Sequence, residues 1–201
     1  MNLVTEPYHL QQERWPNTGN HILAQYDDET IIVYQAYHPT IASFAIKHGY
    51  FGGPFKLSRM SWIKTNFLWM MYRSGWGRKE NQEVTLAIRL KRAAFEKILT
   101  VAVHSQFVSK IYHTKEQWKK ELQESEVRLQ WDPDHDPTGN KVERRAIQLG
   151  LSGSFLEKYA REWIVEIQDI SSFVEEQRKV ANPPFTELIM PKEDIYPIDN
   201  E

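Results

Sequence analysis

The chain has 201 residues, of which 41% are hydrophobic and 26% are charged, and its net charge at pH 7 is −2. These values are typical of a soluble globular protein and give no overall attraction to nucleic acid or to membranes. We therefore expect one globular domain over residues 1–201, with an N-terminal arm at 1–20 and a C-terminal tail at 182–201. Because the chain has no cysteine, disulfides, thiolate nucleophiles, cysteine-bound zinc and iron–sulfur clusters are excluded.

The start of the chain, MNLVTEPYHLQQERWP, lacks the basic and then apolar pattern of a secretory signal. The longest apolar run, at residues 67–72, is far shorter than the roughly twenty residues that cross a bilayer. We therefore expect a cytoplasmic location and no membrane partner.

Residues 21–26 and 30–37 are predicted to form two strands of a hairpin, since a three-residue turn separates them. Alternation in the second strand, TIIVYQAY, places Ile31, Val33, Gln35 and Tyr37 on one face and Ile32, Tyr34 and Ala36 on the other. Both faces are largely apolar, so this strand is expected at the centre of a sheet. Gln35 is then a polar group in a buried row, and it needs a partner or a function.

A short helix is predicted after Pro39, and Gly49 closes it. Residues 50–60 form a loop that contains the paired glycines 52 and 53. Ser61 has the residue type of a helix N-cap, so a second helix is predicted over residues 62–73, ended by Gly75. The run FLWMMY is apolar all round, which indicates that this helix is buried.

The rest of the chain alternates between the two kinds of element. Strands are predicted at 83–90, 126–131, 144–149 and 163–167, with an edge strand at 186–190, and helices at 92–103, 115–125, 154–162 and 171–180. Residues 132–140 read as a long turn that joins two of these strands into a hairpin. The predicted fold is α+β, with a mainly antiparallel sheet, in one piece or split, of six or seven strands and with four or five helices.

Residues 30–79 contain no Asp or Glu, although this stretch is rich in basic and aromatic residues. Its cations are Lys47, Lys56, Arg59, Lys64, Arg73, Arg78 and Lys79. Cations and rings interleaved without acids suit a ligand that carries both phosphate and a flat ring, such as a nucleotide or a nucleic acid. The alternative is that the apolar residues are core and the cations form a solvated rim.

Within this stretch we expect Arg59, Lys64 and Arg73 to bind phosphate, helped by the helix N-terminus predicted at Ser61. Trp62 or Trp76 would stack on a base, and Tyr37 is placed in the same ligand site. The motifs of P-loop and Rossmann proteins are absent, as are G-x-S-x-G and H-E-x-x-H.

The segment from Asp132 to Asp136, DPDHD, carries oxygen and imidazole groups that divalent ions accept as ligands. It lacks the glycine and glutamate of an EF-hand, so we favour a turn and predict no metal. Gln130 alternates away from its apolar neighbours Leu129 and Trp131, which places it on a sheet surface or in a cleft.

The segments VYQAY, RMSWIKTNFLWMMYRSGWG, VRLQWDPDHD and RRAIQLGL resemble a microbial and fungal family, the domain of unknown function 4291. The resemblance extends over roughly residues 21–170 and implies a single domain rather than a particular function.

A second likeness is to ADP-ribosyltransferases, in the order and spacing of TIIVYQAY, IASFAIKHGYF and RMSWIKTNFLWMMY. This resemblance implies NAD bound in a split antiparallel sheet. It places Gln35 where that family has its first His or Arg, and Ser61 where it has its second-motif Ser. Gln130, Glu143 and Gln148 are the choices for the residue that completes the site. The chain departs from that family at position 35, where it has Gln instead of His or Arg. The analogy is therefore at the level of the fold.

The leading hypothesis is a protein that binds a nucleotide or NAD, with NAD as the implied cofactor. It would act as an ADP-ribosyltransferase-like enzyme on a nucleic acid or protein acceptor, with Gln35, Gln130 and Glu143 as catalytic residues. The second hypothesis is a nucleic-acid-binding module that uses the same basic and aromatic stretch. The third is a partner-binding or dimerising protein, and the sequence leaves the oligomeric state open.

Overall fold

The structure is a computed structural model, and it describes residues 3–197. Within these residues the strands are β1 (Thr5–Pro7), β2 (Gly19–Asn20), β3 (Leu23–Ala24), β4 (Thr30–Tyr37), β5 (Ser61–Lys64), β6 (Val84–Lys91), β7 (Val103–His104), β8 (Val127–His135), β9 (Lys141–Leu151), β10 (Ile164–Asp169), β11 (Ile189–Pro191) and β12 (Asp194–Ile195). The helices are α1 (Tyr8–Arg14), α2 (Pro39–His48), α3 (Phe67–Ser74), α4 (Arg92–Thr100), α5 (Lys115–Glu124), α6 (Gly153–Lys158) and α7 (Ser171–Val180), and a π-helical turn, Tyr159–Trp163, follows α6.

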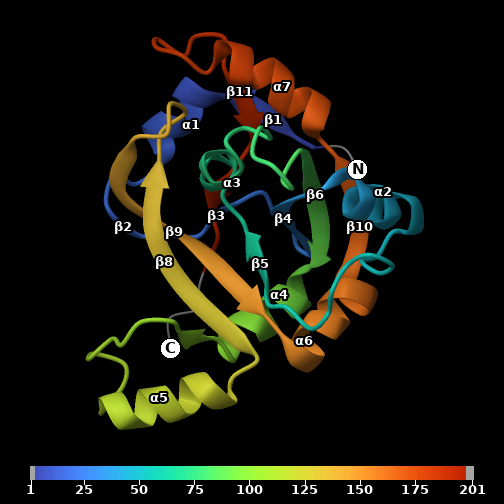
Figure 1. Cartoon of the computed structure of the whole chain (residues 1–201). Helices are drawn as coiled ribbons and strands as arrows, with labels where there is room; N and C mark the ends of the chain where they lie inside the picture. The colour runs from blue at the N-terminus through green and yellow to red at the C-terminus, as the bar shows by residue number, and fades with distance from the viewer. Residues whose placement is uncertain (1–2, 198–201) are drawn as a thin grey trace.

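An eight-stranded mixed sheet dominates the fold (Figure 1). Its order is β10-β6-β4-β5-β9-β8-β7, with β2 beside β9. Most neighbours are antiparallel, and the parallel pairs β2–β9 and β7–β8 are short. The α+β class with a mainly antiparallel sheet is therefore confirmed. Many of the additional strands are two- or three-residue pairings that no sequence pattern marks.

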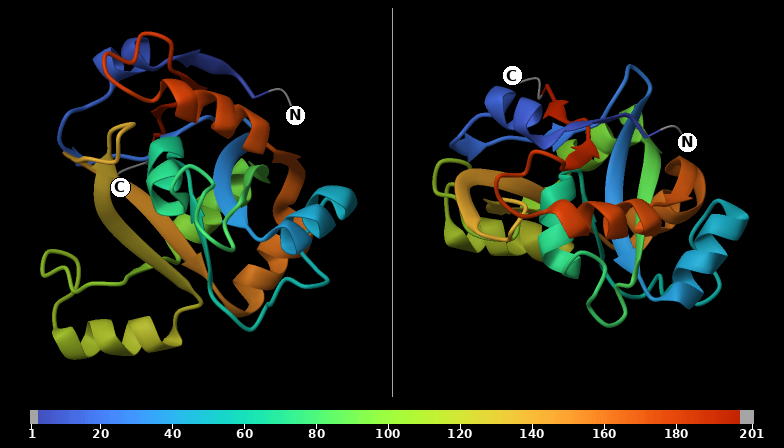
Figure 2. Two further views of the ribbon diagram at one scale, coloured as in Figure 1. Left: turned by 45° about the horizontal axis from the view of Figure 1, so that its top comes forward. Right: turned by 90° about the horizontal axis from the view of Figure 1, so that it is seen from above.

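Strand β4 lies at the centre of this sheet, as its two apolar faces predicted. It pairs with β6 along its whole length, from Thr30 opposite Lys91 to Tyr37 opposite Val84. Ile31 and Val33 enter a core that is covered by α2, α4 and α6. Residues 32 and 34 enter a second core, which is covered by α1, α3 and α7 (Figure 2). The sheet is thus buried on both sides at its centre.

The sheet opens between β4 and β5. These two strands share one registered residue pair, Tyr34 with Lys64. On its other edge β5 pairs with β9 over four residues, from Ser61 opposite Leu151 to Lys64 opposite Gln148. The strands β4 and β5 therefore diverge after the Tyr34–Lys64 pair.

The prediction that Ser61 begins a helix is wrong, because residues 61–64 form β5 between β4 and β9. Helix α3 begins at Phe67, and its N-cap is Asn66, whose Oδ1 accepts a hydrogen bond of 2.7 Å from Trp69 N. The other features of this prediction hold. The helix is buried over most of its length, and it ends at Gly75 in the left-handed conformation, with φ of 59°.

The hairpins differ from their predictions in extent. The first is reduced to a single bridge between Tyr26 and Ile31, since residues 23–24 pair with β12 instead. The second, β8–β9, is confirmed but is longer, because residues 132–135 continue β8. The turn that was predicted over 132–140 is therefore confined to the residues between the two strands.

The two ends of the described chain pack together. Strand β1 pairs with β11, and the Trp15 indole N–H donates to Glu193 O over 2.9 Å. Leu188 and Met190 are fully buried. The predicted C-terminal tail thus contributes Leu188 and Met190 to the second core and Tyr196 to the first, and positions 198–201 lie outside the described residues.

Glu193 is buried at the start of α3. Its Oε1 accepts a hydrogen bond of 2.7 Å from Phe67 N, so it satisfies one of the free N–H groups of the helix terminus. Its backbone N–H donates to Gln11 Oε1 over 2.8 Å. Burial raises the pKa of the Glu193 carboxyl well above its usual range. This side chain therefore joins the C-terminal segment to the start of α3, and its burial favours the neutral form of the acid.

We expect Glu193→Ala to lower the free energy of unfolding by about 3 kcal/mol, because the Phe67 N–H loses its buried acceptor. Glu193→Gln should cost much less at pH 7, since an amide replaces a neutral acid of the same shape. Urea denaturation at several pH values is the measurement. An unfolded Glu releases its proton above about pH 4.5 and the folded one keeps it, so this contribution lowers wild-type stability as pH rises and is absent in Glu193→Gln. Equal losses for both variants would contradict this expectation.

Candidate functional site

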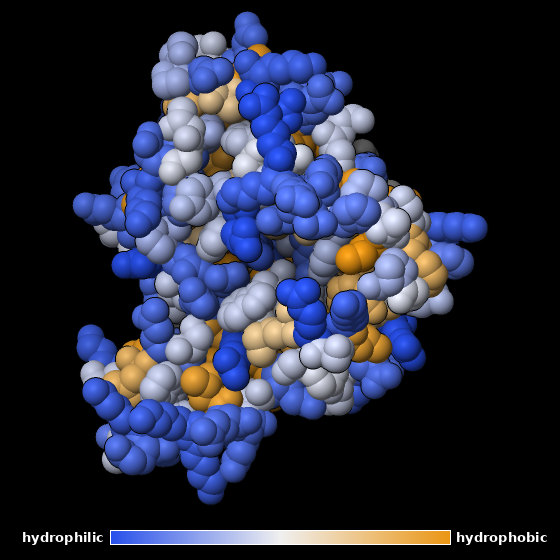
Figure 3. All heavy atoms as spheres, viewed as in Figure 1, coloured by the Kyte–Doolittle hydropathy of each residue, from blue (hydrophilic) through white to orange (hydrophobic). Residues whose placement is uncertain are grey.

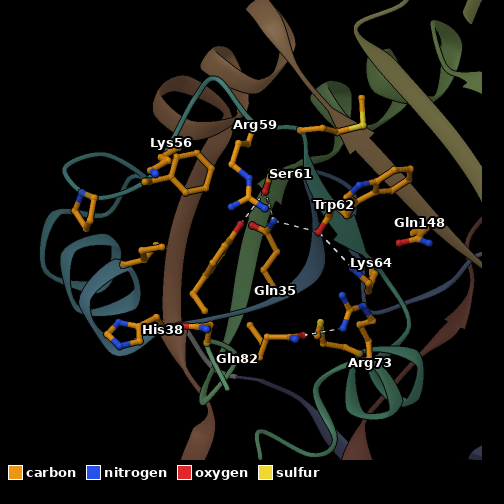
Figure 4. A pocket seen from close by; sticks show the side chains of 18 of the residues that line it. Gln35, His38, Lys56, Arg59, Ser61, Trp62, Lys64, Arg73, Gln82 and Gln148 are labelled. Carbon is orange, nitrogen blue, oxygen red and sulfur yellow. Dashed lines mark hydrogen bonds between the residues drawn. The ribbon is translucent and has the colours of Figure 1, made fainter. Parts of the chain in front are cut away.

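An open cleft of about 870 Å³ lies where β4 and β5 diverge (Figure 4). It brings together eight of the ten predicted site residues: Gln35, Tyr37, Arg59, Ser61, Trp62, Lys64, Arg73 and Gln130. It also contains His38, Phe55, Lys56, Gln82 and Gln148. Among the described residues that line it, none is Asp or Glu. The cleft is therefore a cationic cavity with aromatic and amide groups in its walls.

Gln35 bridges the opening between the two strands. Its Nε2 donates to Ser61 Oγ over 2.9 Å and to the Trp62 carbonyl over 3.1 Å. Its Oε1 accepts a hydrogen bond of 2.7 Å from the Tyr159 hydroxyl. Tyr37 joins the network, because its hydroxyl lies 2.7 Å from Ser61 Oγ. The buried side chain of Gln35 thus has hydrogen-bond partners at both its nitrogen and its oxygen. These bonds join β4 and β5 beyond the one registered residue pair that the two strands share.

Lys64 is a buried cation in the wall of the cleft. It is 6% exposed, and its one hydrogen bond within the described chain is a long one, 3.4 Å from Nζ to the Trp62 carbonyl. An ammonium group has three N–H donors, so most of its capacity is unused. Burial, and then the nearby charge of Arg73, lowers the Lys64 pKa from 10.5 to about 8, against an opposing effect of Asp132. A buried ammonium group of this kind is stabilised when an anion binds beside it.

The other cations stand around the cleft. Arg73 comes from the last turn of α3, near Lys64 in Figure 4, and its guanidinium makes a long contact of 3.5 Å with Gln82 Oε1. Arg59 is exposed and extends from the 50–60 loop toward Ser61 and Gln35 (Figure 4). Neither arginine forms an ion pair with residues 3–197. Their charge is available to a ligand.

Trp62 supplies the largest aromatic surface of the cleft. It is half-buried and lies opposite Gly150 in the β5–β9 pair. A Cβ at Gly150 would lie 2.9 Å from the Trp62 ring and 2.7 Å from Met60 Sδ, so only glycine leaves room for the indole there. Phe55 and Tyr37 offer further ring surface, and they contact each other edge to face.

Two glutamines on neighbouring strands share one carboxylate. Gln148 Nε2 donates to Asp132 Oδ2 over 2.6 Å, and Gln130 Nε2 donates to Asp132 Oδ1 over 2.8 Å. Gln130 Oε1 also accepts a hydrogen bond of 3.3 Å from Ser105 Oγ. Gln130 therefore lies at the cleft as an oriented amide.

Two predicted residues lie elsewhere. The Trp76 indole N–H donates to Pro137 O over 3.3 Å, and its ring packs edge to face on Phe67, so Trp76 lines a separate small pocket instead. Glu143 is exposed and does not line the cleft. Since Ser61 is in a strand, the expected helix N-terminus is also missing from the phosphate site.

Some residues of the cleft were not singled out from the sequence. Lys56 is one of the cations of residues 30–79, so its charge could have marked it as a ligand-binding residue. Tyr159 had none, because it reaches Gln35 from the π-helical turn, which is 124 residues away along the chain. Gln82 follows the loop after α3 and was likewise missed.

The DPDHD segment is engaged in internal contacts. Asp134 forms an ion pair of 2.6 Å with Arg144, and Asp136 accepts hydrogen bonds from Thr138 and Asn140 in the turn. Within residues 3–197 no group of three or more metal-binding side chains is gathered at one place. None of the helices in the same range has the length and apolar character that crossing a membrane requires.

A family model described as "Domain of unknown function (DUF4291)" matches residues 21–196. The chain belongs to the DUF4291 family. The match includes the whole cleft and the Glu193 segment, so the DUF4291 region extends further than the resemblance at 21–170 indicated. No curated protein matches the chain. Nothing in these findings supports the likeness to ADP-ribosyltransferases, which stays a prediction.

We expect Gln35→Met to destabilise the protein by about 3 kcal/mol, because it leaves the buried Tyr159 hydroxyl without its acceptor and the Trp62 carbonyl with only the long contact from Lys64. Tyr159→Phe should cost less. In a double-mutant cycle measured by chemical denaturation, the two changes should couple by about 1 kcal/mol. Gln123→Met on the exposed face of α5 is the control. Additive effects would show that the Gln35–Tyr159 hydrogen bond contributes little.

Proposed function

We propose that this DUF4291 protein binds a nucleotide in the cleft between β4 and β5, and that the ligand is of dinucleotide size, as NAD is. The observation that carries the proposal is Lys64, a buried ammonium group without an anionic partner in the described chain. It lies in a cleft to which Lys56, Arg59 and Arg73 bring further positive charge. An anionic ligand would relieve the cost of burying this charge.

The size and the walls of the cleft narrow the choice of anion. Its volume of about 870 Å³ lies in the upper part of the range typical of small-molecule sites. The Trp62 ring offers a stacking surface, and the amide groups of Gln82 and Gln148 are suited to hydrogen bonding with a base. Charge for phosphate and rings for a base thus occur in one cavity.

Transfer of ADP-ribose from NAD would break the bond between nicotinamide and ribose, and positive charge would develop on the sugar. Enzymes stabilise such charge with oriented dipoles or carboxylates. Among the described lining residues there is no carboxylate, and Asp132 is held by Gln130 and Gln148. The geometry therefore favours binding over transfer, and Gln35 and Gln130, whose amides are held by protein partners, shape the walls of the cleft.

The alternatives are less favoured. Lys79 Nζ donates to the carbonyl of Arg73 over 2.7 Å, and Trp76 packs on Phe67 at a separate pocket. These contacts favour the cleft over one continuous nucleic-acid surface. Hydrophobic residues on the face in Figure 3 occur in small groups between hydrophilic ones. No large apolar patch on that face marks a partner interface.

We expect Lys64→Met to stabilise the free protein and to weaken ligand binding by at least tenfold. The fall in the Lys64 pKa to about 8 corresponds to roughly 3 kcal/mol against the buried charge. Between pH 8 and 10.5 the unfolded chain keeps this proton and the folded one loses it, so wild-type stability should rise there, and Lys64→Met should lack this rise. Denaturation curves at several pH values give the measurement. Lys119→Met on α5 is the control, and a destabilised Lys64→Met would contradict the expectation.

A panel of NAD, ATP, GTP, short RNA and short DNA should separate the alternatives by thermal shift. A ligand at a hundred times its dissociation constant stabilises the fold by about 2.7 kcal/mol. We expect NAD or a mononucleotide to raise the melting temperature. Arg59→Gln should weaken binding by about tenfold, and Arg145→Gln, also exposed but outside the cleft, should not. A shift with oligonucleotides alone would favour the nucleic-acid module.

A further inference from the structure

A row of polar side chains crosses one wall of the cleft. Lys64 on β5 lies opposite Gln148 on β9, and Gln148 lies opposite Gln130 on β8. Residues directly opposite each other in antiparallel strands point to the same face of the sheet. The three side chains therefore stand next to one another, and all three line the cleft.

The orientation of the Gln148 amide is fixed. Asp132 Oδ2 accepts from Gln148 Nε2 over 2.6 Å, and a carboxylate accepts hydrogen bonds but donates none. The amide nitrogen must therefore face Asp132, and the amide oxygen must point away from it. Figure 4 shows this oxygen on the side of Trp62 and Lys64. Within residues 3–197 Gln148 Oε1 accepts no hydrogen bond.

Gln130 differs from Gln148 in this respect. Its Nε2 is held by the other oxygen of Asp132, and its Oε1 already accepts from Ser105 Oγ. Both oxygens of Asp132 are thus used to hold the two amides. The free acceptor of the row is Gln148 Oε1, and the free donor beside it is the Lys64 ammonium group.

We infer that Lys64 and Gln148 together select the ligand. They bind a ligand group that carries an N–H donor next to an acceptor atom. The N–H of the ligand donates to Gln148 Oε1, and the acceptor atom of the ligand accepts from Lys64 Nζ. Asp132 is the positioning residue that sets this order. The inference rests on the proposed function, and it states which hydrogen-bonding groups of the ligand the cleft recognises.

Two parts of NAD have this chemistry. The carboxamide of nicotinamide has an N–H₂ donor beside a carbonyl acceptor, and the edge of adenine has an N6 donor beside the N7 acceptor. A ligand with two acceptors there would set its own oxygen against Gln148 Oε1. A site built to hydrogen-bond a group rejects analogues that lack it, because its own buried polar atoms are left unpaired.

The test compares three dinucleotides by calorimetry at one pH and one salt concentration. They are NAD, its 3-acetylpyridine analogue, which lacks the carboxamide N–H₂, and its hypoxanthine analogue, which lacks the adenine N6 donor. We expect NAD to bind about tenfold more tightly than one of the analogues, and the weaker analogue identifies which end of NAD is read.

Gln148→Met removes the acceptor at similar volume, and Asp132→Asn lets the Gln148 amide turn over. Both variants should bring the ratio of the dissociation constants close to one, while Gln123→Met on α5 should leave it unchanged. Circular dichroism and melting curves check that the variants fold.

Equal binding of all three dinucleotides to the wild type would overturn this inference and leave the proposed function standing. A preference that survives in both Gln148→Met and Asp132→Asn would also overturn it, since other residues would then read the ligand. Failure of all three to bind would overturn the proposed function, and the inference with it.

Discussion

The cleft depends on one interruption in the central sheet, and the side chain of Gln35 makes that interruption stable. Strands that part normally leave unpaired backbone groups, and each buried one is costly. Here Gln35 donates to the Trp62 carbonyl and to Ser61, and Tyr159 donates back to Gln35. A side-chain network thus takes the place of the backbone ladder, and the space between the strands remains open to a ligand.

The positive charges of the cleft lower the stability of the folded protein. Burying Lys64 beside Arg73 without an ion pair costs stability, since burial and like charge disfavour the protonated amine more than the carboxylate of Asp132 favours it. Elsewhere the same chain pairs its buried charges, as Arg144 and Asp134 show with an ion pair of 2.6 Å. An unpaired cation in a cleft is therefore better explained by a ligand than by folding.

The sequence predicted what depends on local pattern and missed what depends on distant contacts. Alternation in residues 30–37 predicted a central strand and a buried polar side chain at Gln35. Both predictions need only the rule that successive side chains of a strand point to opposite faces. Ser61 was taken for an N-cap because its residue type fits, but pairing with Leu151 on β9, far along the chain, makes it a strand residue. Trp76 and Glu143 have suitable chemistry, yet the register of loops and strands directs them away from the cleft.

Helix α3 accounts for the position of two cations of the stretch without acids, Arg73 and Lys79. The helix N-terminus carries partial positive charge and faces the buried Glu193, while its C-terminus carries partial negative charge and bears Arg73. Lys79 Nζ donates to two carbonyls at this end, of Tyr72 and of Arg73. The C-terminal end of α3 thus favours Arg73 beside the cleft, where no carboxylate of the described chain pairs with it. A carboxylate in that position would neutralise Arg73, whereas a helix terminus positions the cation and leaves most of its charge free to bind an anion.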